Sequence, residues 1–177
     1  MNGYDILDVI GKIPMLEYYF KGCYTNSNVP KKFLYLNDGF IIVNTLTQNS
    51  ESVLGHWVMY AKKNNELFFF DSFGISPISY GGDISRLYRT FNQHKMIVFN
   101  YPIQDKSSFI CGLYSIFFSF FLYVKNYSVA LIRSQKIFSK TYTKRNDFFV
   151  KKYIHKLTGF QLLCNEILCP LMIYDTV

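Results

Sequence analysis

The stretch at residues 104–124, QDKSSFICGLYSIFFSFFLYV, constrains the fold of this chain more than any other part of it. It begins with a glutamine and a short polar loop, continues with a cysteine beside a glycine at Cys111, and ends in a long apolar run. Such a run predicts a buried helix, because a helix that is apolar all round must be covered on every side. The pattern therefore predicts a thiol on the first turn of a buried helix. Taken alone, a cysteine before an apolar run is also typical of an ordinary core residue.

Composition and length favour a single folded domain over residues 1–177. Half of the residues are hydrophobic and 19% are aromatic, which excludes a disordered chain. The longest uncharged apolar run, residues 109–124, is shorter than the roughly 18 to 20 residues that span a bilayer. The N-terminus carries acids where a secretory signal carries bases, and four cysteines without a signal fit a reducing compartment. We expect a monomer that is neither secreted nor inserted in a membrane.

The net charge of +7 is concentrated in one segment. Between residues 133 and 156 there are eight basic residues and one acid, whereas the remaining chain carries eleven of each. Such a surface attracts polyanions and releases their counterions, which predicts a patch for nucleic acid. A solvated helical face is the alternative explanation. The predicted patch consists of Lys144, Arg145, Lys151 and Lys152.

The expected elements run from a helix through a group of strands to mainly helices, which indicates an α+β fold. Besides the helix that begins at Cys111, we expect helices at residues 4–10, 83–92, 128–138 and 146–157, with Asn2 and Asn146 as caps, and extended segments at 15–24, 40–45 and 95–101.

Two strand-like runs at residues 55–61 and 67–72, GHWVMYA and LFFFDS, are separated by a short polar loop and predict a β-hairpin. A turn centred on residues 63–64 places His56 directly opposite Asp71. Opposed Cβ atoms lie about 4.5–5.5 Å apart, so the carboxylate can accept a hydrogen bond from the imidazole. The prediction depends on the register, because a slip of one residue puts the two side chains on opposite faces.

Four motifs in this order resemble the cysteine proteases of adenovirus type, the adenain family. They are GHW at residues 55–57, FDSFG at 70–74, Gln104, and CGLYSIFF at 111–118; the run IIVNTLTQNSESVLGHW at 41–57 is also similar to the family segment that leads into its catalytic histidine. The similarity covers residues 40–121. The same order recurs in a wider superfamily that includes proteases for ubiquitin-like modifiers and a bacterial acyltransferase branch. The seven-residue step from Gln104 to Cys111 is nearer the adenovirus type.

The resemblance implies a protease fold with a mixed central sheet, and it implies a role for each matching residue. Cys111 would be the nucleophile, His56 the general base and later the general acid, Asp71 the residue that orients His56, and Gln104 a side-chain donor to the oxyanion. The chemistry agrees, because a helix N-terminus beside an imidazolium favours a thiolate and amide donors stabilise a tetrahedral intermediate. Each residue alone has an ordinary structural explanation. Their combination favours a catalytic site.

Three features differ from the adenoviral enzymes. Phe109 and Ile110 precede the nucleophile where those enzymes have small residues, so we expect a cleft of different shape. No cysteine lies between Asp71 and Gln104, so the disulfide through which a viral peptide activates those enzymes has no counterpart there. Asp71 is one methylene shorter than the glutamate of many adenoviral enzymes and must approach the histidine more closely.

The resemblance implies a viral cysteine endopeptidase that cleaves capsid or other virion precursors, after small residues such as glycine, in the virion and the infected cell. The site requires no cofactor, and a DNA or peptide activator is compatible with it. Two other functions fit the sequence: an isopeptidase for a ubiquitin-like modifier, and a non-catalytic basic virion protein that binds nucleic acid. A zinc site is a weaker alternative, because Cys164 and Cys169 form a close pair but no second pair or histidine lies at ligand spacing.

Overall fold

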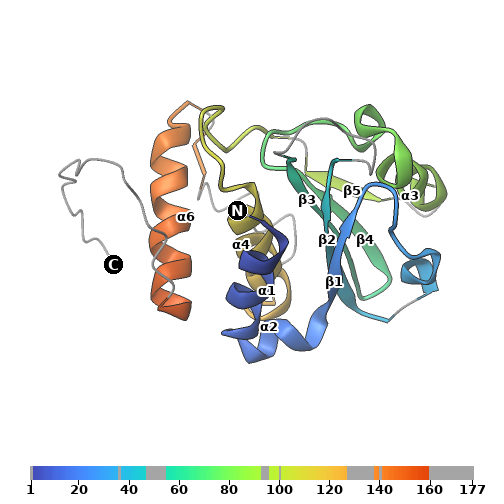
Figure 1. Ribbon diagram of the computed structural model, residues 1–177, viewed down its shortest axis with the longest axis horizontal. Coiled ribbons are helices and arrows are strands. Elements are labelled where there is room, and N and C mark those ends of the chain that lie inside the picture. Colours follow the sequence, from blue (N-terminus) through green and yellow to red (C-terminus); the bar gives the residue numbers. More distant parts are fainter. Residues whose placement is uncertain are drawn as a thin grey trace.

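The computed structural model describes residues 2–35, 37–46, 55–92, 96–99, 101–126, 138–139 and 141–159. These residues form a mixed α+β fold in which a sheet lies between two groups of helices (Figure 1). The sheet has five strands, which lie side by side in chain order: β1 (Phe20–Thr25), β2 (Gly39–Asn44), β3 (Trp57–Lys63), β4 (Glu66–Phe70) and β5 (Ile97–Phe99). The two outer pairs are parallel and the two inner pairs are antiparallel. The predicted α+β class is confirmed.

The central strands are buried on both faces, which explains why their sequences are apolar runs rather than clean alternations. Phe40 and Met59 face one core, whereas Ile41 and Tyr60 face a second core on the opposite side of the sheet. The first core contains α1 (Gly3–Gly11), α2 (Pro14–Tyr19), α4 (Cys111–Tyr123) and α6 (Thr143–Thr158); the second is covered by η1 (Lys31–Tyr35) and α3 (Gly82–Asn92), which follows η2 (Pro77–Tyr80).

Helix α4 is the central helix of the fold, and all thirteen of its residues are buried. It contacts β3 on one side and α1, α2 and α6 on its other sides (Figure 1). An apolar helix of this kind needs no polar face, because neighbouring elements surround it. The predicted buried helix beginning at Cys111 is confirmed. Among the described residues, no helix combines the length and the apolar character needed to cross a bilayer.

Helix boundaries differ from the sequence predictions in two places. The predicted extended segment at residues 15–24 divides into α2 and β1, because Pro14 begins a second helix instead of only ending the first. Helix α6 begins at Thr143 rather than at Asn146, whose amide bonds to Ser139 and Ile103 instead of capping the helix. The predicted helix at 128–138 lies, except for its last residue, outside the described residues.

Candidate active site

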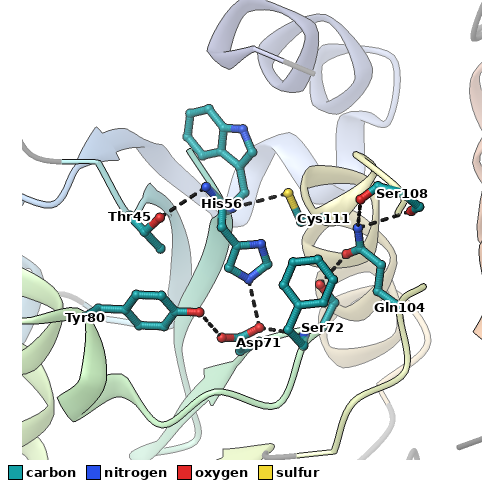
Figure 2. A network of polar contacts seen from close by, with 10 residues as sticks. Thr45, His56, Asp71, Ser72, Tyr80, Gln104, Ser108 and Cys111 are labelled. Atoms are coloured by element: carbon teal, nitrogen blue, oxygen red, sulfur yellow. Dashed lines mark hydrogen bonds and ion pairs between the residues drawn. The ribbon is translucent and has the colours of Figure 1, made fainter. Parts of the chain in front are cut away.

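The site lies where β3 begins, β4 ends and α4 begins. His56 comes directly before β3, and Asp71 directly after β4. Because the two strands are antiparallel, these positions meet at the same end of the sheet. Cys111 is the first residue of α4, which packs against β3. The fold thus brings the three residues together from separate elements (Figure 2).

The hairpin is formed as predicted, but its register is different. Met59 pairs with Phe70, whereas the predicted turn would pair it with Phe68. The cause is the turn, in which Asn64 and Asn65 both have positive φ, as a two-residue type I′ turn requires. The difference is two residues, and an even shift keeps each side chain on the same face of the sheet.

His56 and Asp71 are therefore neighbours without being directly opposed. His56 Nε2 lies 2.8 Å from Asp71 Oδ1. Extension of the observed register beyond the strands would place Phe73 opposite His56, and the two rings are indeed stacked with centroids 4.6 Å apart. The predicted contact between His56 and Asp71 is present although the predicted opposition is wrong.

Asp71 is fully buried, with 0% of its surface exposed, and its carboxylate is held by three donors. Besides the imidazole, the Phe73 N–H donates to Oδ1 at 2.7 Å and the Tyr80 hydroxyl donates to Oδ2. Burial and the nearby Asp71 charge raise the pKa of Tyr80, which keeps its hydroxyl a proton donor. These bonds fix the carboxylate in the orientation that receives the imidazole.

The backbone of His56 is fixed independently of its ring. Thr45 Oγ1 accepts a hydrogen bond from the His56 N–H at 3.1 Å, and the Thr45 N–H donates to the His56 carbonyl at 2.7 Å. This pairing continues the β2–β3 ladder by one residue beyond the strands. The ring therefore projects from a backbone that is held on one side by β2.

The His56 ring lies between the Asp71 carboxylate and the Cys111 sulfur (Figure 2). Since Nε2 meets Asp71, Nδ1 is the ring nitrogen left for the sulfur; it is buried and makes no hydrogen bond to any described residue. Burial by itself lowers the pKa of His56, but the hydrogen bond to Asp71 and the proximity of Cys111 outweigh it and raise the pKa to about 9. The imidazolium form is favoured at neutral pH.

Cys111 is nearly buried and accepts a hydrogen bond from the Trp57 N–H, with N and Sγ 3.3 Å apart. A donor directed at the sulfur stabilises negative charge on it, as does the positive end of the α4 dipole. As the first residue of the helix, Cys111 also presents an N–H that has no acceptor within the helix. The sulfur thus has the His56 ring on one side and backbone donors nearby.

Gln104 lies in the loop before α4, with 2% of its surface exposed. Its Oε1 accepts from the Ser72 hydroxyl at 2.6 Å, and its Nε2 donates to the Ser108 carbonyl at 2.8 Å and to the Ser108 Oγ at 3.2 Å (Figure 2). Ser72 follows Asp71 directly in the chain. The Gln104 side-chain amide is therefore bonded to the residue next to the Asp71 carboxylate. To donate to an oxyanion, Gln104 must exchange one of its two bonds to Ser108.

Several residues of this network were not identified from the sequence. They are Thr45, Ser72, Phe73, Tyr80 and Ser108. Phe73 at least belongs to the FDSFG motif, but Tyr80 carries no local signal, because it reaches Asp71 only through the path of the loop after β4. Phe109, predicted to alter the cleft, is 68% exposed, whereas Ile110 is buried.

The predicted nucleic-acid patch is separate from this network. Lys144, Arg145 and Lys152 are exposed on α6 and Lys151 is half-buried, and α6 covers α4 on the side away from the sheet (Figure 1). Within the described part of the chain, no three His, Cys, Asp or Glu side chains are grouped so that they could hold a metal ion. Cys164 and Cys169 lie outside the described residues.

Comparison with known proteins adds no relative to this description. No protein-family model matches the chain, and no curated protein matches it significantly.

Proposed function

We propose that this protein is a cysteine endopeptidase in which Cys111, His56 and Asp71 form the catalytic triad and Gln104 helps to stabilise the oxyanion. The observation that carries the proposal is the His56–Asp71 contact of 2.8 Å with the Cys111 sulfur on the other side of the ring. A structural histidine would not require a fully buried carboxylate with three donors on one side and a thiol on the other.

The chemistry follows from these positions. The Cys111 thiolate attacks the carbonyl carbon of the scissile amide, and the negative charge passes to the carbonyl oxygen. The backbone N–H of Cys111 and one N–H of Gln104 donate to that oxygen. As the C–N bond breaks, the His56 imidazolium gives its proton to the leaving amine. His56 then removes a proton from water, the hydroxide displaces the thioester sulfur, and the thiolate returns.

The substrate follows from the resemblance in the sequence. We infer that the enzyme cleaves capsid or other virion precursors of a virus or virus-like mobile element, after a small residue such as glycine, in the virion and the infected cell. A probe ending in the Gly-Gly of a ubiquitin-like modifier, offered beside a capsid-precursor peptide, distinguishes this activity from that of an isopeptidase.

Replacement of the nucleophile tests the proposal. We expect Cys111→Ala to lower cleavage of virion precursors by at least about a thousandfold, because no other group in the site can form the thioester. Cys23→Ala is the matched control and should retain activity: burial raises the pKa of the Cys23 thiol to about 12, so it stays protonated. Mass mapping of the products measures both variants. Unchanged processing by Cys111→Ala contradicts the proposal.

The exposed face of α6 favours a second role, binding of nucleic acid. Lys144, Arg145 and Lys152 lie on this face together with the exposed ring of Phe148. Cationic side chains that track phosphates, with an aromatic ring on which a base can stack, are the combination used by proteins that bind single strands. This role is compatible with catalysis, because α6 contributes none of the triad residues.

A further inference from the structure

The loop that carries Gln104 is attached to α6 on the side away from the catalytic residues. We call residues 103–108 the Gln104 loop. Asp147, in the second turn of α6, accepts from the Asp105 N–H at 3.3 Å. The Tyr114 hydroxyl of α4 donates to the same carboxylate oxygen at 2.7 Å. One carboxylate oxygen therefore binds the Gln104 loop at Asp105 and helix α4 at Tyr114.

Two further side chains of α6 bind the same loop. The Asn146 amide donates to the Ile103 carbonyl at 2.8 Å, and the Thr143 hydroxyl donates to Asp105 Oδ2 at 3.0 Å. Asn146 is itself fixed by accepting from the Ser139 N–H at 2.9 Å. The first two turns of α6 are thus bonded to the loop at Ile103 and at Asp105.

The Asp147 carboxylate is buried, which requires an explanation. Only 6% of its surface is exposed, and a buried carboxylate costs free energy that an apolar residue would not. Its position is explained by its partners: Asp105 belongs to the Gln104 loop, and the Tyr114 hydroxyl also contacts the Ile103 carbonyl of that loop. Ser108 is the residue to which Gln104 donates both of its N–H groups. The Ser108 N–H in turn donates to the Asp105 carbonyl at 3.0 Å, so hydrogen bonds lead from Gln104 through Ser108 and Asp105 to Asp147.

We propose that Asp147 is a positioning residue for the oxyanion site: through Asp105 it holds the Gln104 loop so that the Gln104 amide points toward the carbonyl oxygen of the substrate. This inference rests on the proposed protease function. The Ser108 N–H donates to the Asp105 carbonyl at 3.0 Å, so the position of Ser108 depends on that of Asp105. The longer of the two Gln104 bonds, 3.2 Å to Ser108 Oγ, is the one exchanged for the oxyanion. Because Ser108 still donates to Asp105 and Asp105 still donates to Asp147, Ser108 keeps its place during that exchange.

The test separates oxyanion stabilisation from the reactivity of the thiol. In Asp147→Ala we expect kcat for a fluorogenic peptide amide with glycine before the scissile bond to fall about tenfold or more, with KM little changed, because small displacements of catalytic donors are costly. Alkylation of Cys111 by iodoacetamide should stay within about twofold of wild type, because it forms no oxyanion. Asp147→Asn, which keeps Oδ1 as an acceptor, should retain most of the activity.

Val150→Ala is the matched control, because Val150 is buried on the same helix and belongs to the apolar core. Hydrogen exchange gives a readout that does not depend on activity: amides of the Gln104 loop should exchange faster in Asp147→Ala and remain as in wild type in Val150→Ala. Unchanged exchange in Asp147→Ala, or an equal loss of kcat in the two variants, overturns the inference. A wild-type Cys111 that is neither alkylated selectively nor able to hydrolyse the peptide overturns the proposed function instead, and the exchange result still decides whether Asp147 holds the loop.

Discussion

At the scale of single residues, two opposing effects determine the pKa of His56. Its burial disfavours charge, whereas Asp71 on one side and Cys111 on the other favour it, and the net result raises its pKa to about 9. The ordinary value is 6.5. In the proposed protease, a histidine with this balance would already be charged when the substrate binds, so it could supply a proton to the leaving amine without first taking one from the thiol.

This balance predicts the pH dependence of both stability and activity. A raised pKa in the folded state means that the stabilisation from His56 is fully present below pH 6.5 and is lost as the pH rises to about 9. We expect the free energy of unfolding to fall over that interval, as measured by urea denaturation at several pH values. The rate of peptide hydrolysis should fall near its upper end, because the imidazolium is then lost.

The Asp71→Asn variant provides the comparison, because it removes the carboxylate that contributes most to the raised pKa. Its stability deficit relative to wild type should be largest near pH 6 and should shrink toward pH 9, where the wild-type ring is losing its proton. A ring titration followed by NMR should move to lower pH in the variant. A deficit that grows with pH contradicts the assigned ion pair.

At the scale of elements, the β3–β4 hairpin shows what the sequence could and could not predict. Apolar runs around a polar loop were enough to predict two strands and the end of the sheet at which His56 and Asp71 lie. The register required the turn type, and the Asn64–Asn65 pair carried that information, because asparagine tolerates the positive φ of a type I′ turn. The His56–Asp71 contact is present despite the wrong register, because a shift of two residues leaves each side chain on the same face of the sheet.

The segment that enters β3 gives a second prediction. A Cβ added at Gly55 would lie 1.8 Å from Asn44 Oδ1 and 2.6 Å from Leu46 Cγ, so the neighbours would have to move. Asn44 Oδ1 accepts from the Leu46 N–H at 2.9 Å and so shapes the end of β2 that pairs with His56. We expect Gly55→Ala to lower stability by about 1–3 kcal/mol, measured by denaturation, and to reduce peptide hydrolysis.

Gly11→Ala is the control for this substitution. A Cβ at Gly11 meets nothing within 4 Å, and alanine is the better helix former, so the variant should be as stable as wild type or slightly more stable. If Gly55→Ala behaves like Gly11→Ala in both stability and hydrolysis, the close approach of Gly55 to Asn44 does not position the histidine.

At the scale of the whole molecule, the sequence predicted the α+β class, the buried helix and the grouping of His56, Asp71 and Cys111. Local patterns were sufficient for the class, the helix and the His56–Asp71 pair, whereas the grouping of Cys111 with that pair came from the resemblance of the four motifs to adenovirus-type proteases. The contacts of Tyr80, Ser108 and Asp147 were not predictable, since they join loops and helices whose relative path depends on packing. The same reason explains why Asn146, expected to be a cap, binds the Gln104 loop instead.

Helix α6 combines two surfaces of opposite character. Its inner face carries Asn146 and Asp147 toward the Gln104 loop, whereas its outer face carries Lys144, Arg145 and Lys152 to solvent. Helix α6 itself carries five Lys and Arg residues against one acid, Asp147. A polyanion should therefore bind this side of the molecule in preference to the rest of its surface.

We expect the protein to bind single-stranded DNA, with an affinity that falls as salt rises, because each neutralised phosphate releases counterions. Changing Lys144, Arg145, Lys151 and Lys152 together to glutamine should weaken binding. The slope of log affinity against log salt should become shallower by roughly 0.7 for each phosphate that the variant no longer neutralises. Fluorescence anisotropy with a labelled oligonucleotide between low and physiological salt measures both quantities.

The control must remove the same amount of charge elsewhere, because any loss of four positive charges weakens long-range attraction. Neutralising the exposed lysines Lys12, Lys31, Lys32 and Lys125 meets this condition, since none of them lies on α6. If α6 binds the phosphates directly, the control keeps most of the wild-type slope and the α6 variant does not. Equal slopes in the two variants mean that the charge of the whole molecule, rather than this helix, attracts the DNA.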